Sequence, residues 1–209
     1  MSGIFVTFEG IEGCGKSTQL ALLANWLRGN GREVVTTREP GGTEVGEKIR
    51  AILQAGNSGD VFSERTEILL FEASRAQHVR EKIFPALKDN KIVLCDRFVD
   101  STAVYQGAAR GIGHDVVKFL NDFASHGRYP DMTVFLDISI AASFGRIAAR
   151  SNGRDRIEQE DERFFKRVRN HYLKLASENA RFFTVAGTAT VEAIHEKIRN
   201  EFAGKFFKN

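Results

Sequence analysis

The sequence is poor in cysteine, in proline and in long apolar runs. It has 2 Cys and 3 Pro among 209 residues, and the cysteines, Cys14 and Cys95, lie far apart along the chain. They provide neither a disulfide framework nor paired zinc-ligand spacing, so we expect a reducing cytoplasm. No apolar run approaches the roughly 20 residues of a membrane helix, and the first residues lack the basic segment of a signal peptide. We therefore expect no membrane partner.

A large excess of one charge is also missing. The 30 Lys and Arg against 27 Asp and Glu give a formal net charge of +3, too small a surplus to indicate nucleic acid as a partner. Hydrophobic residues make up 42% and charged residues 27%, which excludes a disordered chain, a collagen and a membrane bundle. Because no repeat or linker divides the chain, residues 1–209 are predicted to form a single domain.

Short apolar runs alternate with longer helical patterns. We expect strands at residues 4–8, 34–37, 92–95, 133–137 and 183–185. We expect helices at residues 19–27, 43–54, 63–88 with a kink near Pro85, 115–125, 141–150, 158–178 and 191–202. The strands are apolar throughout, as in a parallel sheet covered by helices on both faces. The alternation predicts an α/β fold with a doubly wound, five-stranded parallel sheet.

Ligands of such sheets bind beyond the carboxyl ends of the strands. The residues that follow the first four predicted strands begin at Glu9, Arg38, Asp96 and Asp137. Three of these four segments are rich in charged residues, and core packing does not require charged residues at these positions. We therefore expect the site at this edge of the sheet.

The segment after the first strand matches the phosphate-loop pattern G-x-x-x-x-G-K-[ST]. Its residues are Gly10, Ile11, Glu12, Gly13, Cys14, Gly15, Lys16 and Ser17, followed by Thr18. Glycines let consecutive N–H groups turn inward around a phosphate chain, and the following helix adds its positive end. Lys16 is expected to reach the β and γ phosphates, and Ser17 to help hold Mg²⁺, partly through water. The pattern predicts a P-loop NTPase-type site for ATP.

The P-loop alone leaves the fate of the triphosphate open. A guanine-nucleotide switch is disfavoured, because no Asp has Gly three residues on and Asn90-Lys91 is not followed by x-Asp. A P-loop ATPase or regulatory module is one alternative, and another nucleoside or nucleotide kinase is a second.

Three further segments resemble the signature blocks of thymidylate kinases. They are residues 94–106 (LCDRFVDSTAVYQ), residues 37–43 (TREPGGT) and residues 155–172, the last of which begins with the residues DRIE. The blocks run in family order from residue 4 to about residue 172. The resemblance implies transfer of the ATP γ-phosphate to dTMP, with Mg²⁺, by a homodimer of P-loop nucleoside monophosphate kinase domains. It also implies a short lid at approximately residues 146–158.

The reaction brings two sets of negative oxygens together, so catalysis depends on positioning and on neutralising charge. The family's pattern implies that Arg97 contacts the dTMP phosphate, for which its planar fork suits two oxygens at once. Asp96 would orient Arg97 or act through Mg²⁺-bound water. Arg38 and Arg50 are further candidates for this phosphate, and Arg50 could equally be an exposed helical arginine.

The resemblance also assigns residues to the nucleoside. Phe71 would stack on the thymine, and Arg75, four residues on and therefore on the same helix face, would donate to its O4 carbonyl. Ser101, Thr102 and Gln106 would line the same pocket. Tyr105 would crowd the sugar 2′ carbon, and Glu12 would accept from the 3′ hydroxyl.

Arginines at positions 146, 150, 154 and 156 fall near the predicted lid. The family places a catalytic arginine either in the P-loop or in the lid, and this P-loop has none. Arg154 is therefore the first candidate and Arg150 the second. Arg146 is interpreted as a solvated helix end.

Overall fold

The computed structural model describes residues 3–54, 62–149 and 156–207, and its centre is a five-stranded sheet. The strands are β1 (Ile4–Glu9), β2 (Val34–Arg38), β3 (Ile92–Asp96), β4 (Met132–Asp137) and β5 (Phe182–Ala186). Their order is β2-β3-β1-β4-β5, and every neighbouring pair is parallel. The predicted five-stranded parallel sheet is confirmed.

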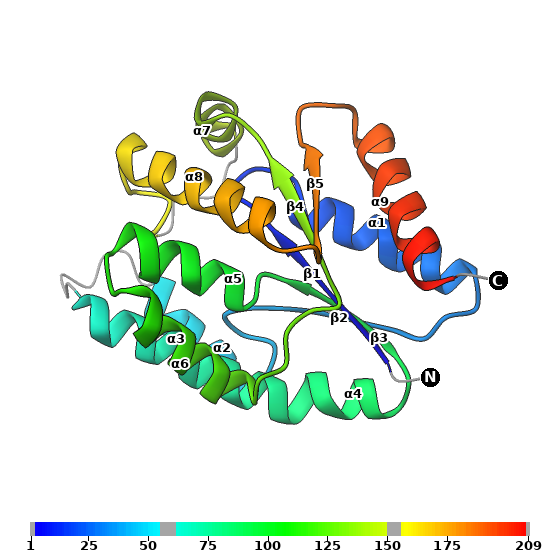
Figure 1. Ribbon diagram of the computed structural model, residues 1–209, viewed down its shortest axis with the longest axis horizontal. Coiled ribbons are helices and arrows are strands. Elements are labelled where there is room, and N and C mark those ends of the chain that lie inside the picture. Colours follow the sequence, from blue (N-terminus) through cyan, green and yellow to red (C-terminus); the bar gives the residue numbers. More distant parts are fainter. Residues whose placement is uncertain (1–2, 55–61, 150–155, 208–209) are drawn as a thin grey trace.

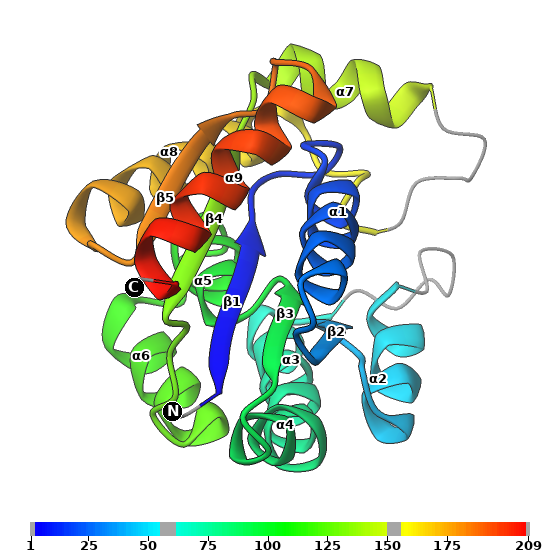
Figure 2. The ribbon, with the colours of Figure 1, turned by 90° about the vertical axis from the view of Figure 1, so that its right-hand side faces the viewer.

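Helices cover both faces of this sheet (Figures 1 and 2). On one face lie α1 (Lys16–Gly29) and α9 (Val191–Phe206); on the other lie α3 (Glu64–His78), η1 (Val79–Ile83), α4 (Phe84–Lys88), α5 (Val99–Thr102), η2 (Ala103–Ala109), α6 (His114–Ser125) and α8 (Glu162–Glu178). Beyond the edge strand β2 lies α2 (Glu44–Gln54), and α7 (Ile140–Ala148) lies beside the carboxyl ends of the strands. No helix of the described residues has the length and apolarity needed to cross a bilayer.

The central strands form the driest part of the core. Five of the six residues of β1 are buried, and so are the first four of β3 and the first five of β4. Because β1 lies between β3 and β4, the loop that follows it opens at the middle of the carboxyl edge. This is the place where a parallel α/β sheet binds its ligand.

The structure differs from the predicted elements in three places. The helix expected over residues 63–88 contains a π-helical stretch, η1, directly before α4, whose second residue is Pro85. The helix α8 begins at Glu162 rather than at residue 158, because the Asp161 carboxylate accepts from Phe164 N at 2.7 Å and caps it. The helical stretch of α5 and η2 was not predicted, and it holds much of the site.

Candidate active site

The P-loop turns sharply between β1 and α1. Gly15 has φ +102° and precedes the first helical residue, Lys16. Gly13 has φ +74°, and a Cβ there would approach Ser143 O at 3.2 Å. Glycine accepts this left-handed backbone without strain, and a side chain at Gly13 would in addition crowd α7. The Lys16 ammonium lies within this turn, where it donates to Gly10 O at 3.1 Å and to Ile11 O at 3.2 Å.

Helix α7 holds the P-loop from outside. Ser143 Oγ donates to Glu12 O at 2.7 Å. Arg146 Nη1 donates to Gly13 O at 3.1 Å, and its Nη2 donates to Gly187 O at 2.9 Å. Arg146 is exposed in the last turn of α7, as expected, and its guanidinium also joins the P-loop to the segment after β5.

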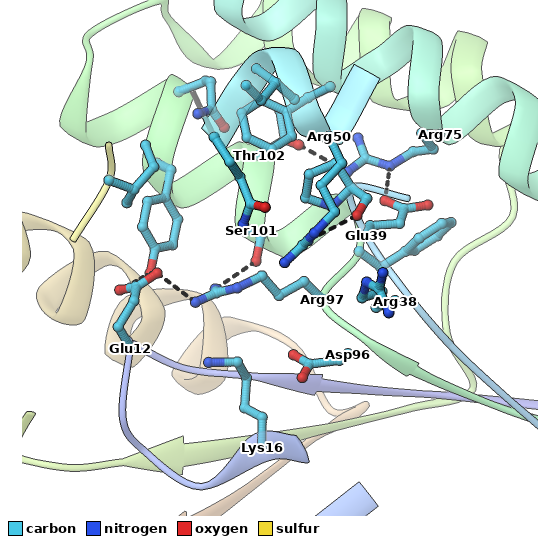
Figure 3. Close-up of a pocket in the computed structure, with 18 of the residues that line it drawn as sticks. Glu12, Lys16, Arg38, Glu39, Arg50, Arg75, Asp96, Arg97, Ser101 and Thr102 are labelled. Carbon is cyan, nitrogen blue, oxygen red and sulfur yellow. Dashed lines mark hydrogen bonds and ion pairs between the residues drawn. The ribbon is translucent and has the colours of Figure 1, made fainter. Parts of the chain in front are cut away.

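A cavity of about 280 Å³ opens between the P-loop, α2, α3 and the α5–η2 stretch (Figure 3). It is lined by every residue predicted for the acceptor: Glu12, Arg38, Arg50, Phe71, Arg75, Arg97, Ser101, Thr102, Tyr105 and Gln106. Lys16, Ser17 and Asp96 line it as well. Of the other P-loop residues, Ile11 and Cys14 are buried in the core, and Thr18 is exposed. The structure thus brings the two predicted halves of the site together.

Arg97 is the residue at the centre of this cavity. Its backbone has φ +72°, and its guanidinium donates to Glu12 Oε1 at 2.7 Å and to Ser101 Oγ at 3.1 Å. Tyr105 OH donates to both Glu12 oxygens, at 3.0 and 2.9 Å. Burial opposes the charge of Arg97, but Tyr105 and Glu12 outweigh it and raise its pKa. Arg97 is therefore a permanent cation aimed at the P-loop.

Glu9, which sequence reasoning noted only as the end of a strand, lies beneath Arg97. Its side chain is fully buried and accepts from Phe98 N at 2.8 Å and from Ser101 Oγ and Tyr172 OH, both at 2.7 Å. Burial, and then the negative charge of Asp100, raise the pKa of Glu9 to about 7. An acid closing an otherwise apolar strand was the available signal for this residue.

Arg75 is 1% exposed, and three of its four partners, Glu39, Glu72 and Asn121, were not assigned to the site from the sequence. Its hydrogen-bond acceptors are Glu39 at 2.8 Å, Glu72 at 2.6 Å, Asn121 at 2.7 Å and Thr102 at 2.9 Å. Burial opposes its charge, but Glu39 and Glu72 outweigh this and raise the pKa of Arg75. Four of its five N–H groups have these partners, and the fifth has none among the described residues.

Glu39 connects Arg75 to the end of β2. His78 Nδ1 donates to Glu39 Oε1 at 2.9 Å, and His78 Nε2 lies 2.6 Å from Thr37 Oγ1. All three side chains are at most 9% exposed. The chain from Thr37 through His78 and Glu39 fixes the direction in which Arg75 enters the cavity wall.

The remaining charged residues frame the two ends of the cavity. Ser17 Oγ, in the P-loop, donates to Asp96 Oδ2 at 2.7 Å, so a hydroxyl and a carboxylate oxygen lie next to each other there. Arg38 Nη2 pairs with Glu47 Oε2 at 2.8 Å, and Arg50 Nη1 donates to Pro40 O at 3.0 Å. Arg50 lines the cavity, so it is not merely an exposed helical arginine.

With this geometry the chain can be compared with known proteins. The family model for thymidylate kinase matches residues 8–198. The chain belongs to the thymidylate kinase family. Similar thymidylate kinases are those of Fervidobacterium nodosum, 47% identical over 199 residues (95% of this chain, 98% of the relative), and of Kosmotoga olearia, 49% identical over 200 residues (95% of each). The crystal structure of thymidylate kinase from Ehrlichia chaffeensis is similar with a TM-score of 0.79 and 32% identity, covering 97% of this chain and 100% of that one.

The thymidylate kinase predicted from the sequence, a phosphotransferase that uses ATP, is thereby confirmed. The alternatives, a P-loop ATPase module or another nucleotide kinase, lose their support. Two of the predicted residues, Arg150 and Arg154, lie outside the described residues.

Proposed function

We propose that this thymidylate kinase transfers the γ-phosphate of ATP to dTMP, giving ADP and dTDP, inside the cavity between the P-loop and Arg97. The observation that carries the proposal is that one cavity is lined on one side by Lys16 and Ser17 and on the other by Arg38, Arg97 and Phe71. A phosphate donor and a nucleotide acceptor can then meet end to end.

The P-loop, residues 10–17, is the proposed donor site, together with Thr18 directly after it. Its N–H groups and the N-terminus of α1 surround the phosphates, and the Lys16 ammonium neutralises the β and γ phosphates. Ser17 Oγ and the Asp96 carboxylate are the hard oxygen ligands that Mg²⁺ prefers, and they lie 2.7 Å apart. The described residues hold no cluster of three or more His, Cys, Asp or Glu that could bind a metal. Ser17 and Asp96, together with phosphate oxygens and water, would hold Mg²⁺, which would supply positive charge to the phosphates.

Arg97 is the proposed catalytic ligand of the acceptor phosphate, with Arg38 and Arg50 as binding residues beside it. Three guanidinium groups lining one small cavity suit the oxygens of a monophosphate. In Figure 3 the Arg97 side chain extends above Lys16 towards Glu12, in agreement with the hydrogen bond between Arg97 and Glu12. Asp96 lies next to Lys16 in the same view and can orient water at the metal.

The nucleoside end of dTMP is assigned to the wall made by α3 and the α5–η2 stretch. Phe71, half-buried, offers a ring face for the thymine, and Arg75 offers its remaining N–H to the O4 carbonyl. Ser101, Thr102 and Gln106 complete this wall. Tyr105 and Glu12, joined by hydrogen bonds, are placed to contact the sugar, Tyr105 at the 2′ carbon and Glu12 at the 3′ hydroxyl.

The donor side needs a further cation, because the P-loop holds Glu12 and Cys14 but no arginine. We assign this role to Arg154 first and Arg150 second, in the lid segment at approximately residues 146–158. This assignment is supported by the chemistry of the reaction, because negative charge develops on the phosphate oxygens during transfer and a positioned arginine stabilises it.

An apolar surface on α3 and α6 supports the proposed homodimer. Leu69, Val116, Phe119 and Phe123 are 57%, 52%, 67% and 74% exposed, and the rings of Phe119 and Phe123 stack with centroids 6.4 Å apart. Clustered exposed aromatics of this kind mark protein–protein contacts. The free, buried thiols of Cys14 and Cys95 fit the proposed reducing cytoplasm.

The test is a coupled assay of ADP release with and without an acceptor. We expect ADP release that depends on dTMP, with dTMP preferred in a panel of dTMP, dUMP, UMP and AMP. ADP release that is indifferent to every monophosphate would contradict the proposal, and a preference for UMP or AMP would assign the chain to another acceptor.

A further inference from the structure

A buried carboxylate on α3, Glu67, binds side chains from two separate segments, the end of η2 and the residues before α8. Glu67 is 2% exposed, and its Oε1 accepts from Gln106 Nε2 at 2.7 Å. Its Oε2 accepts from Arg156 Nη2 at 2.5 Å, and Arg110 approaches both oxygens at 3.4 and 3.5 Å. A buried charge is tolerated only with such partners, so this arrangement is specific rather than incidental.

Arg156 belongs to the third family block but points to the acceptor side of the cavity. Besides Glu67, its Nε donates to Leu53 O at 3.3 Å, and its guanidinium lies 5.3 Å from the centre of the Phe62 ring. Leu53 lies in α2, one residue before its end, and lines the same cavity as Phe71 and Arg75. In this position Arg156 serves the acceptor wall rather than the donor phosphates.

The contacts of Glu67 reach the cavity through two neighbours. Gln106, 2% exposed, lines the cavity, and its amide is oriented because Nε2 is committed to Glu67. Ile157, directly after Arg156, lines the cavity as well. Releasing Glu67 would therefore loosen two parts of the acceptor wall at once.

Glu67 keeps its negative charge in this setting. Burial opposes the charge, but the hydrogen bond from Gln106 and the positive charges of Arg110 and Arg156 outweigh burial and lower the pKa of Glu67. Arg110 is itself held by Glu160, at 2.7 Å. The cluster therefore consists of two cations, Arg110 and Arg156, and two anions, Glu67 and Glu160.

We infer that Glu67 and Arg156 form a positioning pair for dTMP binding: Glu67 orients Gln106 and fixes Arg156, and Arg156 in turn holds Ile157 against the acceptor wall. This inference rests on the proposed function, because it concerns the same acceptor site. It removes Arg156 from the arginines that could assist the donor phosphates, and it gives the DRIE block a task on the acceptor side.

The test compares Arg156→Met, Glu67→Gln, the double variant and a matched control, Arg163→Met, which makes the same change at an exposed position on α8. Calorimetry measures dTMP and ADP binding separately, steady-state kinetics gives kcat and KM, and thermal unfolding reports stability. For Arg156→Met we expect dTMP binding to weaken about 5- to 30-fold. ADP affinity and kcat at saturating dTMP should stay at the level of the control.

Three results would overturn the inference. A large loss of kcat with unchanged dTMP affinity would make Arg156 a donor-side arginine, and a lower melting temperature alone would leave it a purely structural role. Additive losses of dTMP affinity in the double variant would show that the two residues do not act through one contact, whereas we expect the second change to add little.

These experiments also distinguish a failure of this inference from a failure of the proposed function. If Glu67→Gln does not fold, Arg156→Met decides alone, because the Arg156 side chain is 20% exposed and its loss opens no core cavity. A wild-type protein that neither binds dTMP nor releases ADP in its presence would overturn both statements. An active wild type with an Arg156→Met variant that matches the control would overturn only the positioning role.

Discussion

Arg97 and Glu12 stand 85 residues apart in the sequence, yet Arg97 Nη2 lies 2.7 Å from Glu12 Oε1. The pair joins the P-loop to the residue after β3 and crosses the cavity in which we place the reaction. Both side chains are mostly buried, at 17% and 13% exposure, so the pair has more weight than a solvated surface ion pair. A phosphate that reaches Arg97 must therefore compete with, or join, the Glu12 carboxylate.

Arg97→Ala tests this arrangement directly. We expect kcat/KM for dTMP to fall by about 100- to 1000-fold, because the guanidinium stabilises charge that develops during transfer. Arg97→Lys should recover only part of the rate, since an ammonium lacks the planar fork. Turnover is measured by ADP release and folding by thermal unfolding. Near-normal turnover in a folded Arg97→Ala variant would remove the residue from the site.

Tyr105 is the expected discriminator against ribose. Tyr105→Ala should raise the use of UMP relative to dUMP, because the ring that crowds the 2′ carbon is gone. Tyr105→Phe is the matched control: it keeps the ring but loses the hydrogen bonds to Glu12, so dTMP should bind about fivefold more weakly with the sugar preference retained. Equal discrimination in all three proteins would return Tyr105 to a packing role.

The proposed lid arginines make a kinetic prediction. Arg154→Ala should lower kcat about 10³-fold or more and leave dTMP affinity nearly unchanged, because a positioned arginine acts on the transferring phosphoryl group. If Arg150→Ala lowers kcat more than Arg154→Ala does, Arg150 rather than Arg154 is the main catalytic arginine. Single-turnover rates and dTMP binding are measured on each variant. A variant that loses dTMP affinity instead would belong to the acceptor side.

The raised pKa of Glu9 predicts a pH-dependent stability. Between about pH 4.5 and pH 7 the folded protein binds more protons at Glu9 than the unfolded chain does, so this group lowers the free energy of unfolding as pH rises through that window. Above about pH 7 Glu9 is ionised in both states, and the free energy of unfolding no longer changes with pH through this group. The Glu9→Gln variant has no such titrating group. Urea unfolding at pH 5, 6, 7 and 8 should therefore show that the free energy of unfolding of the wild type falls relative to that of the variant as pH rises. A constant difference across the series would contradict the assignment.

The apolar surface on α3 and α6 predicts the oligomeric state. Phe123→Asp, which places a charge at a ring 74% exposed, should convert a dimer to a monomer in analytical ultracentrifugation. Val191→Asp makes a similar change at an exposed apolar residue on α9 and should leave the dimer intact. A monomeric wild type would refute the dimer, and a dimeric Phe123→Asp variant would place the interface elsewhere.

Local spacing explains why so much of the site could be predicted. The P-loop is eight consecutive residues, and Phe71 and Arg75 share a helix face because they are four apart. The apolar strands likewise predict the parallel sheet without knowledge of its neighbours. Each of these features depends only on residues close in sequence.

The missed residues depend on contacts between distant segments. Glu9 and Tyr172 are hydrogen-bonded across 163 positions, and Glu39 reaches His78 across 39. An acid at a strand end looks the same in the sequence whether it faces solvent or a tyrosine on α8. The start of α8 was misplaced for a related reason, since an acidic stretch offers several candidate caps and only the fold selects Asp161.

The four partners of Arg75 set a limit on compounds that would compete with dTMP. Among the residues that the structure describes, partners occupy four of its five N–H groups, so a heterocycle with a single carbonyl at that end can accept from the fifth. A second acceptor placed beside it would meet no donor from Arg75 and would lose its hydration without compensation. An inhibitor that binds this wall should therefore place one acceptor oxygen towards Arg75. Its other polar groups should lie at the end that binds the phosphate.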